Sequence, residues 1–323
     1  MITIKYAELL IQNGDNIFAP IVEDGVTWDT SRSGEPGKLT FSVLKDSILD
    51  FTEGDAVRLR YGGDNIFYGF VFQKKRDKDG VIEVTAYDQL RYLKNKDTYV
   101  YSNKTAGEVI QMIADDFRLK TGELEDTGYK IPSRVEDNKT LFDIIQTALD
   151  ETLRNTKRLF VMYDDFGKLT LKNIESMKLN LLIDEAAGEN FSYTSSIDGE
   201  TYNKIKLAYD NDKTGKREIY IAQDSENMNR WGVLQYFDTI KEEINGKAKA
   251  DALLQLYNQK TRNLTISNVL GDTSVRAGSS VIVKMDVGDL TVANFMIVEK
   301  AKHTFSENEH LMDLTLRGGD FIA

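Results

Sequence analysis

Apolar and polar residues alternate with a period of two between residues 39 and 86, and this pattern constrains the fold more than any other feature. Turn-forming glycine, asparagine and aspartate residues separate the apolar runs, which are Leu39 to Val43, Val57 to Tyr61, Ile66 to Phe72 and Ile82 to Ala86. Successive side chains of a strand point to opposite faces, so the pattern is typical of antiparallel strands with one buried face. The sequence predicts an antiparallel β domain over residues 1–92.

The spacing of the apolar residues changes after Arg91. Two segments with helical spacing follow, at 105–117 and 140–155, and the first opens on a capping-box sequence at Thr105 and Glu108. A hairpin is expected over residues 159–174. We therefore predict a small α+β domain over residues 93–185.

Strand-like alternation returns between residues 202 and 317, and an amphipathic helix interrupts it at about 240–260. This pattern predicts a second antiparallel β domain over residues 186–323, with a helical insertion at about 226–261. The expected fold class is mixed β and α+β, with two β domains flanking the small α+β domain.

The two predicted β domains share an order of features. The segment Glu53 to Leu59 aligns with Ala277 to Val283, and in both places a turn, a long apolar strand, a basic stretch and a final alternating strand follow. One interpretation is an internal duplication. The other is that any antiparallel meander with glycine turns aligns this well, and the pattern alone does not decide between them.

Composition excludes several classes of chemistry. Lys and Arg total 41 against 52 Asp and Glu, and the net charge of -11 repels nucleic acid and anionic membranes. The absence of cysteine removes disulfides, thiolate metal sites and thiol nucleophiles. No leader pattern or long apolar stretch is evident. We expect a protein made in the cytoplasm, without a nucleic-acid or membrane partner.

No segment carries a complete catalytic or metal-binding signature. His303 and His310 lie on neighbouring predicted strands and supply at most half of a zinc site, so a surface or ladder role is favoured. Nucleophile elbows and phosphate-binding glycine loops are absent from the sequence. We therefore expect no enzyme activity, no catalytic residues, no metal and no cofactor.

The loop Thr30 to Lys38 is polar and rich in glycine and proline. Such a segment is expected to project from the sheet as a hairpin tip, where it is either a solvated turn or a contact element. Arg32, Glu35 and Lys38 are the candidate protein-interface residues.

The order of these features resembles the hub proteins of phage tail baseplates, in particular the XkdQ-like family of PBSX-type prophages and related contractile tail particles. The matching segments are Val26–Trp28, Leu39–Val43, Gly54–Leu59, Phe67–Phe72, Thr85–Asp88, Arg91–Lys96, Trp231–Gln235 and the strands between Gly278 and Leu316. They cover most of the chain. None is a chemical signature, so the resemblance rests on order and spacing.

The resemblance implies two tube-like antiparallel β-barrel domains in one polypeptide. It further implies a homotrimeric ring that adapts a hexameric tail tube to a trimeric central spike, with the tube protein, the spike protein and other baseplate proteins as partners. Such a protein is assembled in the bacterial cytoplasm and becomes part of a virion or phage-like tail particle.

Two other functions stay open at this point. A cell-wall hydrolase of a tail particle would need a convergent carboxylate pair or a metal cluster. A carbohydrate or host-surface binding module is suggested by Trp28 and Trp231, although buried anchors explain such aromatic residues equally well.

Overall fold

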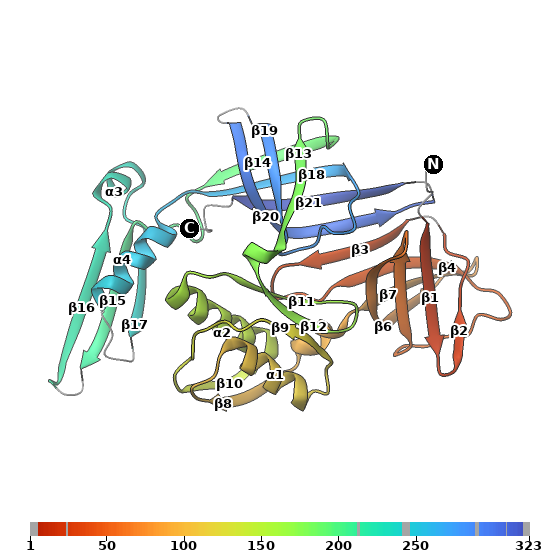
Figure 1. Cartoon of the computed structure of the whole chain (residues 1–323), viewed down its shortest axis with the longest axis horizontal. Helices are drawn as coiled ribbons and strands as arrows, with labels where there is room; N and C mark the ends of the chain where they lie inside the picture. The colour runs from red at the N-terminus through yellow and green to blue at the C-terminus, as the bar shows by residue number, and fades with distance from the viewer. Residues whose placement is uncertain are drawn as a thin grey trace. The chain divides into compact units, whose positions relative to one another are not determined.

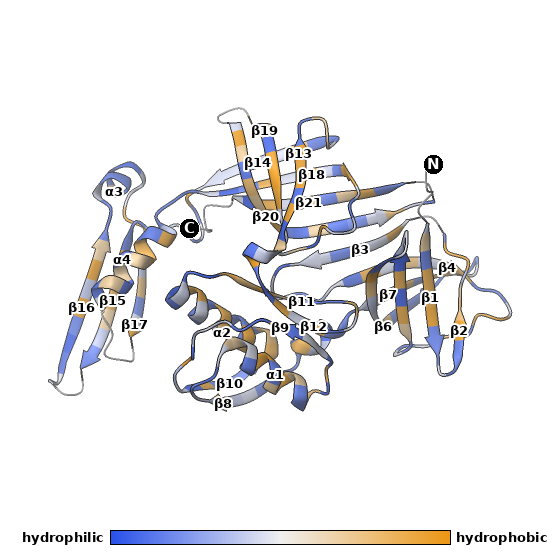
Figure 2. Cartoon of the chain, in the orientation of Figure 1, coloured by the Kyte–Doolittle hydropathy of each residue, from blue (hydrophilic) through white to orange (hydrophobic). Residues whose placement is uncertain are grey.

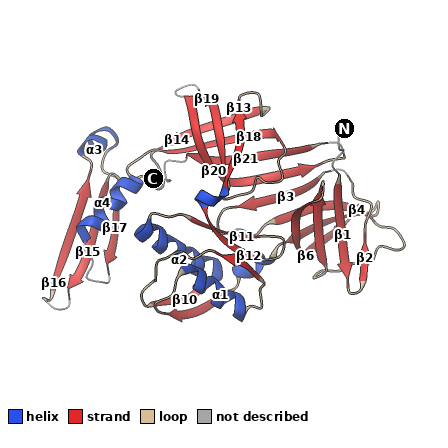
Figure 3. Cartoon of the chain, viewed as in Figure 1, coloured by secondary structure: helices blue, strands red, loops and turns tan. Residues whose placement is uncertain are grey.

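The computed structural model describes residues 6–23, 25–211, 214–240, 246–287, 291–307 and 309–318. Contacts divide the chain into two compact units, one formed by Met1–Ser192 with Thr265–Ile322 and the other by Tyr193–Leu264. Strands predominate in Figures 1 and 3, and most pairs are antiparallel. The mixed β and α+β class predicted from the sequence is confirmed.

The first unit begins with an antiparallel set of strands that we call the first copy. Its strand order is β3-β4-β7-β6-β5-β1. The bounds are β3 (Val26–Ser31), β4 (Lys38–Leu44), β7 (Val81–Tyr87), β6 (Asp64–Arg76), β5 (Ala56–Tyr61) and β1 (Ala7–Asn13), and the short β2 (Asn16–Phe18) extends the edge. Hydrophobic and hydrophilic residues alternate along these strands (Figure 2), and the buried face includes Leu39, Phe41, Val57 and Leu59. The alternation therefore forms the core that it predicted.

A second set of strands, the second copy, has the order β14-β18-β21-β20-β19-β13. The bounds are β14 (Asn190–Ser196), β18 (Thr261–Leu270), β21 (His310–Gly318), β20 (Thr291–Phe305), β19 (Ser280–Asp286) and β13 (Lys178–Asp184). Position by position this order matches the first copy, except that β13 pairs with β19 in parallel whereas β1 pairs with β5 antiparallel. No pairing among the described strands closes either copy into a barrel.

Matching glycines show that the two copies are a duplication. Gly54 and Gly278 both have a φ of +95°, in the left-handed region that favours glycine. Their N–H groups donate to the carbonyl oxygens of Val71 and Val298 respectively, each at 2.8 Å. Two unrelated meanders have no reason to share a backbone conformation and its hydrogen bond, so the alternative left open by the sequence is resolved in favour of duplication.

A β-bulge lies at the corresponding place in each long strand. The register shifts between Val71 and Gln73 in β6 and between Val298 and Lys300 in β20. Bulges bend a strand and increase its twist. Ion pairs at matching positions follow each bulge, Lys75–Glu83 in the first copy and Lys302–Asp313 in the second.

Between the copies lies an α+β segment with its own hydrophobic core. Thr105 and Glu108 form the predicted capping box of α1, because the Glu108 N–H donates to Thr105 Oγ1 and the Thr105 N–H donates to Glu108 Oε2. Domain boundaries near residues 92 and 185 stay a prediction, since this segment and both copies share one compact unit. Its elements are η1 (Gln89–Lys94), β8 (Lys96–Tyr101), α1 (Ala106–Asp116), β9 (Thr121–Leu124), β10 (Arg134–Thr140), α2 (Leu141–Thr156), β11 (Phe160–Asp164), β12 (Leu169–Asn173) and η2 (Ile174–Met177).

The second unit is a three-stranded sheet with helices. It contains β15 (Lys204–Asn211), β16 (Lys216–Gln223), α3 (Ser225–Trp231), β17 (Gln235–Ile240) and α4 (Gly246–Tyr257). The sequence placed the strands at 202–209 and 218–223 in the second antiparallel β domain, and this was wrong, because in the structure they form a separate sheet with β17. In chain order the unit begins within β14 and ends within β18, where the first copy has only the loop between β3 and β4.

The glycine pair generates a stability prediction. Gly54→Ala should lower the free energy of unfolding by about 1 kcal/mol, because alanine resists a positive φ. Gly278→Ala should cost more, since its new Cβ would lie 2.5 Å from Cγ1 of Val161. Urea unfolding of both variants measures the difference. Gly107→Ala in α1, where a Cβ meets only ordinary contacts, is the control and should be neutral or stabilising. Equal losses at Gly54 and Gly278 would contradict the packing.

Candidate functional site

Strand β3 of the first copy pairs antiparallel with β20 of the second copy, and we call this junction the seam. Its register pairs Ser31 with Lys300, Trp28 with His303 and Val26 with Phe305. Only the part of β20 after the bulge takes part, because the part before it pairs with β19. The seam joins the two copies edge to edge in one sheet.

A buried pair of histidines lies at the seam. Nδ1 of His303 is 2.9 Å from Nε2 of His310, and Nε2 of His303 is 3.0 Å from the carbonyl oxygen of Val275. A carbonyl only accepts, so Nε2 of His303 carries the hydrogen and its Nδ1 accepts from His310. Both ring nitrogens of His303 are therefore used in hydrogen bonds. The sequence favoured a surface role or a place in the strand ladder. Both histidines are buried and belong to the paired strands β20 and β21, so the second of these is correct.

Aromatic rings surround the histidines and exclude water. The ring of His303 lies 4.9 Å from that of Trp28, and the ring of His310 lies 4.3 Å from Phe305 and 5.0 Å from Tyr61. Burial, with a smaller contribution from His310, lowers the pKa of His303 to about 3. Within the described residues, no group of three or more histidine, cysteine, aspartate and glutamate side chains is arranged to hold a metal ion.

A second buried cluster ties both copies to the α+β segment. Asp88, which follows β7, accepts hydrogen bonds from the N–H groups of Gly37 and Leu90. Arg276, which precedes β19, donates to the carbonyl oxygen of Asp164 and stacks 3.9 Å from the ring centre of Tyr163. Burial raises the pKa of Asp164 to about 6 and that of Asp88 well above its usual range. The cluster holds three parts of one unit in a fixed arrangement.

The loop that was expected to project is instead anchored at both ends. Arg32 forms an ion pair with Glu299 at 2.8 Å, and Pro36 and Gly37 are buried. A Cβ at Gly37 would lie 2.3 Å from Asp88 Oδ2, so glycine here permits the carboxylate to reach the backbone. The sequence interpretation took glycine and proline as marks of a free turn, and at Gly37 the glycine marks close packing.

Two of the three candidate interface residues, Glu35 and Lys38, line one surface cavity, and Arg32 does not. Glu35 is exposed and lies 3.7 Å from Lys300, whereas Lys38 lies 3.2 Å from Asp29. Arg32 is mostly covered, with 16% of its side chain exposed. The tip, residues 33–35, and the side chain of Lys38 are exposed for contact with another molecule.

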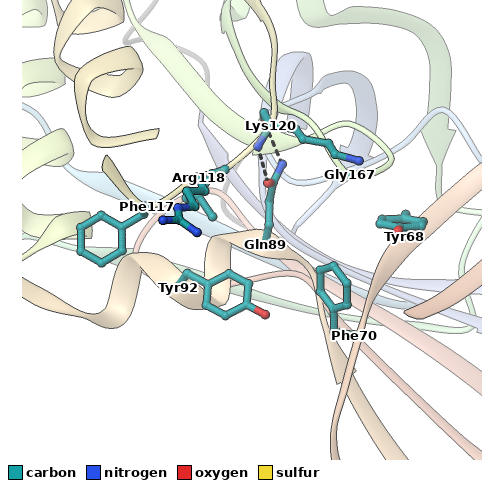
Figure 4. Close-up of a pocket in the computed structure, with 9 residues that line it drawn as sticks. Tyr68, Phe70, Gln89, Tyr92, Phe117, Arg118, Lys120 and Gly167 are labelled. Atoms are coloured by element: carbon teal, nitrogen blue, oxygen red, sulfur yellow. Dashed lines mark hydrogen bonds between the residues drawn. The ribbon is translucent and has the colours of Figure 1, made fainter. Parts of the chain in front are cut away.

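Sequence reasoning missed an aromatic cleft between the first copy and the α+β segment (Figure 4). The cleft has a volume of about 280 Å³ and is lined mainly by Tyr68, Phe70, Tyr92 and Phe117, with Arg118 and Lys120 at its side. Gln89 closes one wall through two hydrogen bonds with the backbone of Lys120. The alternation from Ile66 to Phe72 placed Tyr68 and Phe70 on the buried face of the strand, and this assignment was wrong. In the structure Phe67 and Val71 are buried in the core, and Tyr68 and Phe70 line the cleft.

Comparison with known proteins places the chain in a family. The model of the YQBQ-like family matches residues 26–317, which include the seam and both copies. The chain belongs to the YQBQ-like family. Two curated relatives come from Bacillus subtilis strain 168: the uncharacterised protein YqbQ, 29% identical over 91% of each chain, and the phage-like element PBSX protein XkdQ, 28% identical over 93% of this chain and 94% of the relative.

Among solved structures, the fold of this YQBQ-like chain is similar to that of the 43 kDa tail protein of prophage MuSo2 from Shewanella oneidensis. The TM-score is 0.70 at 14% identity, with 98% of this chain and 99% of the other covered. No helix in the described ranges is long and apolar enough to cross a membrane.

The histidine pair generates a pH prediction. The folded pKa of His303, about 3, lies below the ordinary value of 6.5, so the unfolded chain binds more protons and stability falls as pH drops below about 6.5. His303→Gln should be less stable than wild type at pH 7. At pH 5 the difference in free energy of unfolding between wild type and His303→Gln should be smaller by about 2 kcal/mol. Only wild type loses stability at this pH, because its histidine binds a proton in the unfolded chain but not in the folded one.

Chemical denaturation at both pH values measures this difference. Asp164→Asn is a comparison with the opposite sign. The folded pKa of Asp164, about 6, lies above its ordinary value of 3.8, so wild type loses stability as the pH rises from about 4 to 6. Wild type should therefore gain stability relative to Asp164→Asn between pH 7 and pH 5. A difference in free energy of unfolding between wild type and His303→Gln that does not change with pH would show that His303 is not held neutral.

Proposed function

We propose that this chain is the structural baseplate hub of a phage or phage-like tail. Three copies form a ring that adapts a hexameric tail tube to a trimeric central spike. The observation that carries the proposal is the duplication: two copies with one strand order are joined edge to edge within the chain. The names of PBSX XkdQ and of the MuSo2 tail protein support a place in a tail particle.

Symmetry explains why a duplicated chain suits this task. A hexameric tube ends in six equivalent surfaces, and a ring of three chains with two similar β copies each offers six similar surfaces to it. The same ring has true threefold symmetry because the two copies differ, for example in the parallel pairing of β13 and in the inserted unit. A trimeric spike therefore finds three equivalent sites.

The proposed partners follow from this arrangement. They are two further copies of the chain, the tail tube protein, the central spike protein and other baseplate proteins. The loop Thr30 to Lys38, with Arg32, Glu35 and Lys38 as its candidate residues, is the proposed contact with a tube or baseplate neighbour. Assembly in the bacterial cytoplasm and incorporation into the particle follow from the same proposal, and a net charge of -11 gives it no attraction for nucleic acid.

The competing functions gain no support from the described residues. Trp28, one of the two tryptophans considered for carbohydrate binding, is 4% exposed and stacks on His303, so its ring has no free face for a sugar. The buried carboxylates Asp88 and Asp164 hold backbone N–H groups of their own chain. A structural role is the proposal that uses both features.

Solution mass tests the proposal. Multi-angle light scattering over a range of concentrations, with the chain alone and then with its neighbouring tail proteins, should detect a species of about 110 kDa, three times the 36.6 kDa chain. Association of the chain should persist at moderate salt if backbone pairing drives it. A monomer or a dimer under every condition would contradict the hub.

A further inference from the structure

Several strand edges lack a backbone partner in the described part of the chain, among them the following two. The first is the outer edge of β14, which lies at the end of the strand order. The second is the stretch Gln73–Arg76 of β6, because β6 pairs with β5 only through residues 64–70 and pairs with β7 alone after its bulge. The side chains of both stretches are mostly exposed. Unpaired strand edges are templates for pairing with another chain.

The duplication identifies these two edges as counterparts of the seam. The bulges equate Val71 with Val298, so Gln73–Arg76 corresponds to Lys300–His303, the stretch of β20 that pairs with β3. Strand β14 corresponds to β3 because both occupy the same place in their copies. Matching hydrogen bonds support this, with Glu23 N–H donating to Ser42 and Glu189 N–H donating to Ser267.

We propose that β14 of one chain pairs antiparallel with Gln73–Arg76 of β6 in a second copy of the chain, repeating between molecules the seam that β3 and β20 make within one. The proposal rests on the proposed ring and names the edges that build it. Trp28 lies opposite His303 in the seam. Trp28 lies five residues after Glu23, and His303 lies five residues after Val298. The corresponding residues are Thr194, five after Glu189, and Arg76, five after Val71. We therefore expect Thr194 of one chain to lie opposite Arg76 of the other.

A second copy must supply the partner. Within one chain, seven steps of the strand order separate β14 from β6, and each step spans about 4.8 Å, or roughly 34 Å along the sheet. The contact uses different edges of the two molecules, so it is head-to-tail and either closes into a ring or continues as a filament. Lys74, Lys75 and Arg76 on the β6 edge disfavour pairing with arbitrary strands.

Disulfide trapping tests the pairing, and the chain has no native cysteine to interfere. Opposed residues of antiparallel strands have Cα atoms about 4.5–5.5 Å apart, within the reach of a disulfide. The full chain carrying Arg76→Cys and Thr194→Cys, oxidised in solution, should give covalent species of one, two and three chains and none larger. Mixing chains that carry only one of the two substitutions should give dimers alone.

The matched control combines Thr194→Cys with Val135→Cys. Val135 is an exposed strand residue of β10, 67% exposed, away from the proposed edge, and this variant should stay monomeric on a non-reducing gel. Ser192→Cys and Ser196→Cys with Arg76→Cys test the register and should cross-link less. Unfolding curves of the reduced variants at Arg76, Ser192 and Thr194 should match wild type, since these side chains are exposed.

The outcomes separate this proposal from the hub proposal. A trimer in solution without cross-linking at any of the three β14 positions overturns the edge pairing and leaves the hub standing. A ladder that continues beyond three chains supports the pairing and overturns the closed ring. Monomers by light scattering together with no cross-linking overturn both.

Discussion

The antiparallel pairing of β3 with β20 is the interaction on which the rest of the structure depends. It joins segments about 270 residues apart in the chain and makes one sheet from two copies. The pairing needs the bulge of β20, because the strand must leave β19 before it meets β3. Rings from both copies then cover the paired backbone, and the ring nitrogens of His303, which are buried there, are hydrogen-bonded to His310 and to the carbonyl oxygen of Val275.

The remaining features stabilise or extend this seam. Arg276, Asp88 and Asp164 lock the α+β segment to both copies, and the loop after β3 is held against β20 by the Arg32–Glu299 ion pair. In the second copy the equivalent loop position carries the whole unit Tyr193–Leu264. A surface loop tolerates such an insertion because it lies outside the core. The chain thus keeps the duplicated framework and differs between the copies at this loop position.

Local periodicity predicted the elements better than their pairing. Alternation at Leu39 to Val43 and at Ile82 to Ala86 identified strands of the first copy, and the glycine-led segments at Gly54 and Gly278 pointed to the duplication. The seam was out of reach because alternation does not encode which distant edge a strand meets. Gly37 and Asp88 were missed for a related reason: a glycine that permits close packing and a glycine in a free turn look alike in sequence.

The central claim is that the duplicated copies form six similar segments of one ring. Electron cryomicroscopy of the purified chain with its tail neighbours tests it most directly. The account predicts a threefold ring in which six β copies surround a lumen, with β14 of each chain continuous with β6 of the next. A ring or other assembly in which only one copy of each chain lines the lumen, or one with twofold symmetry, would contradict it.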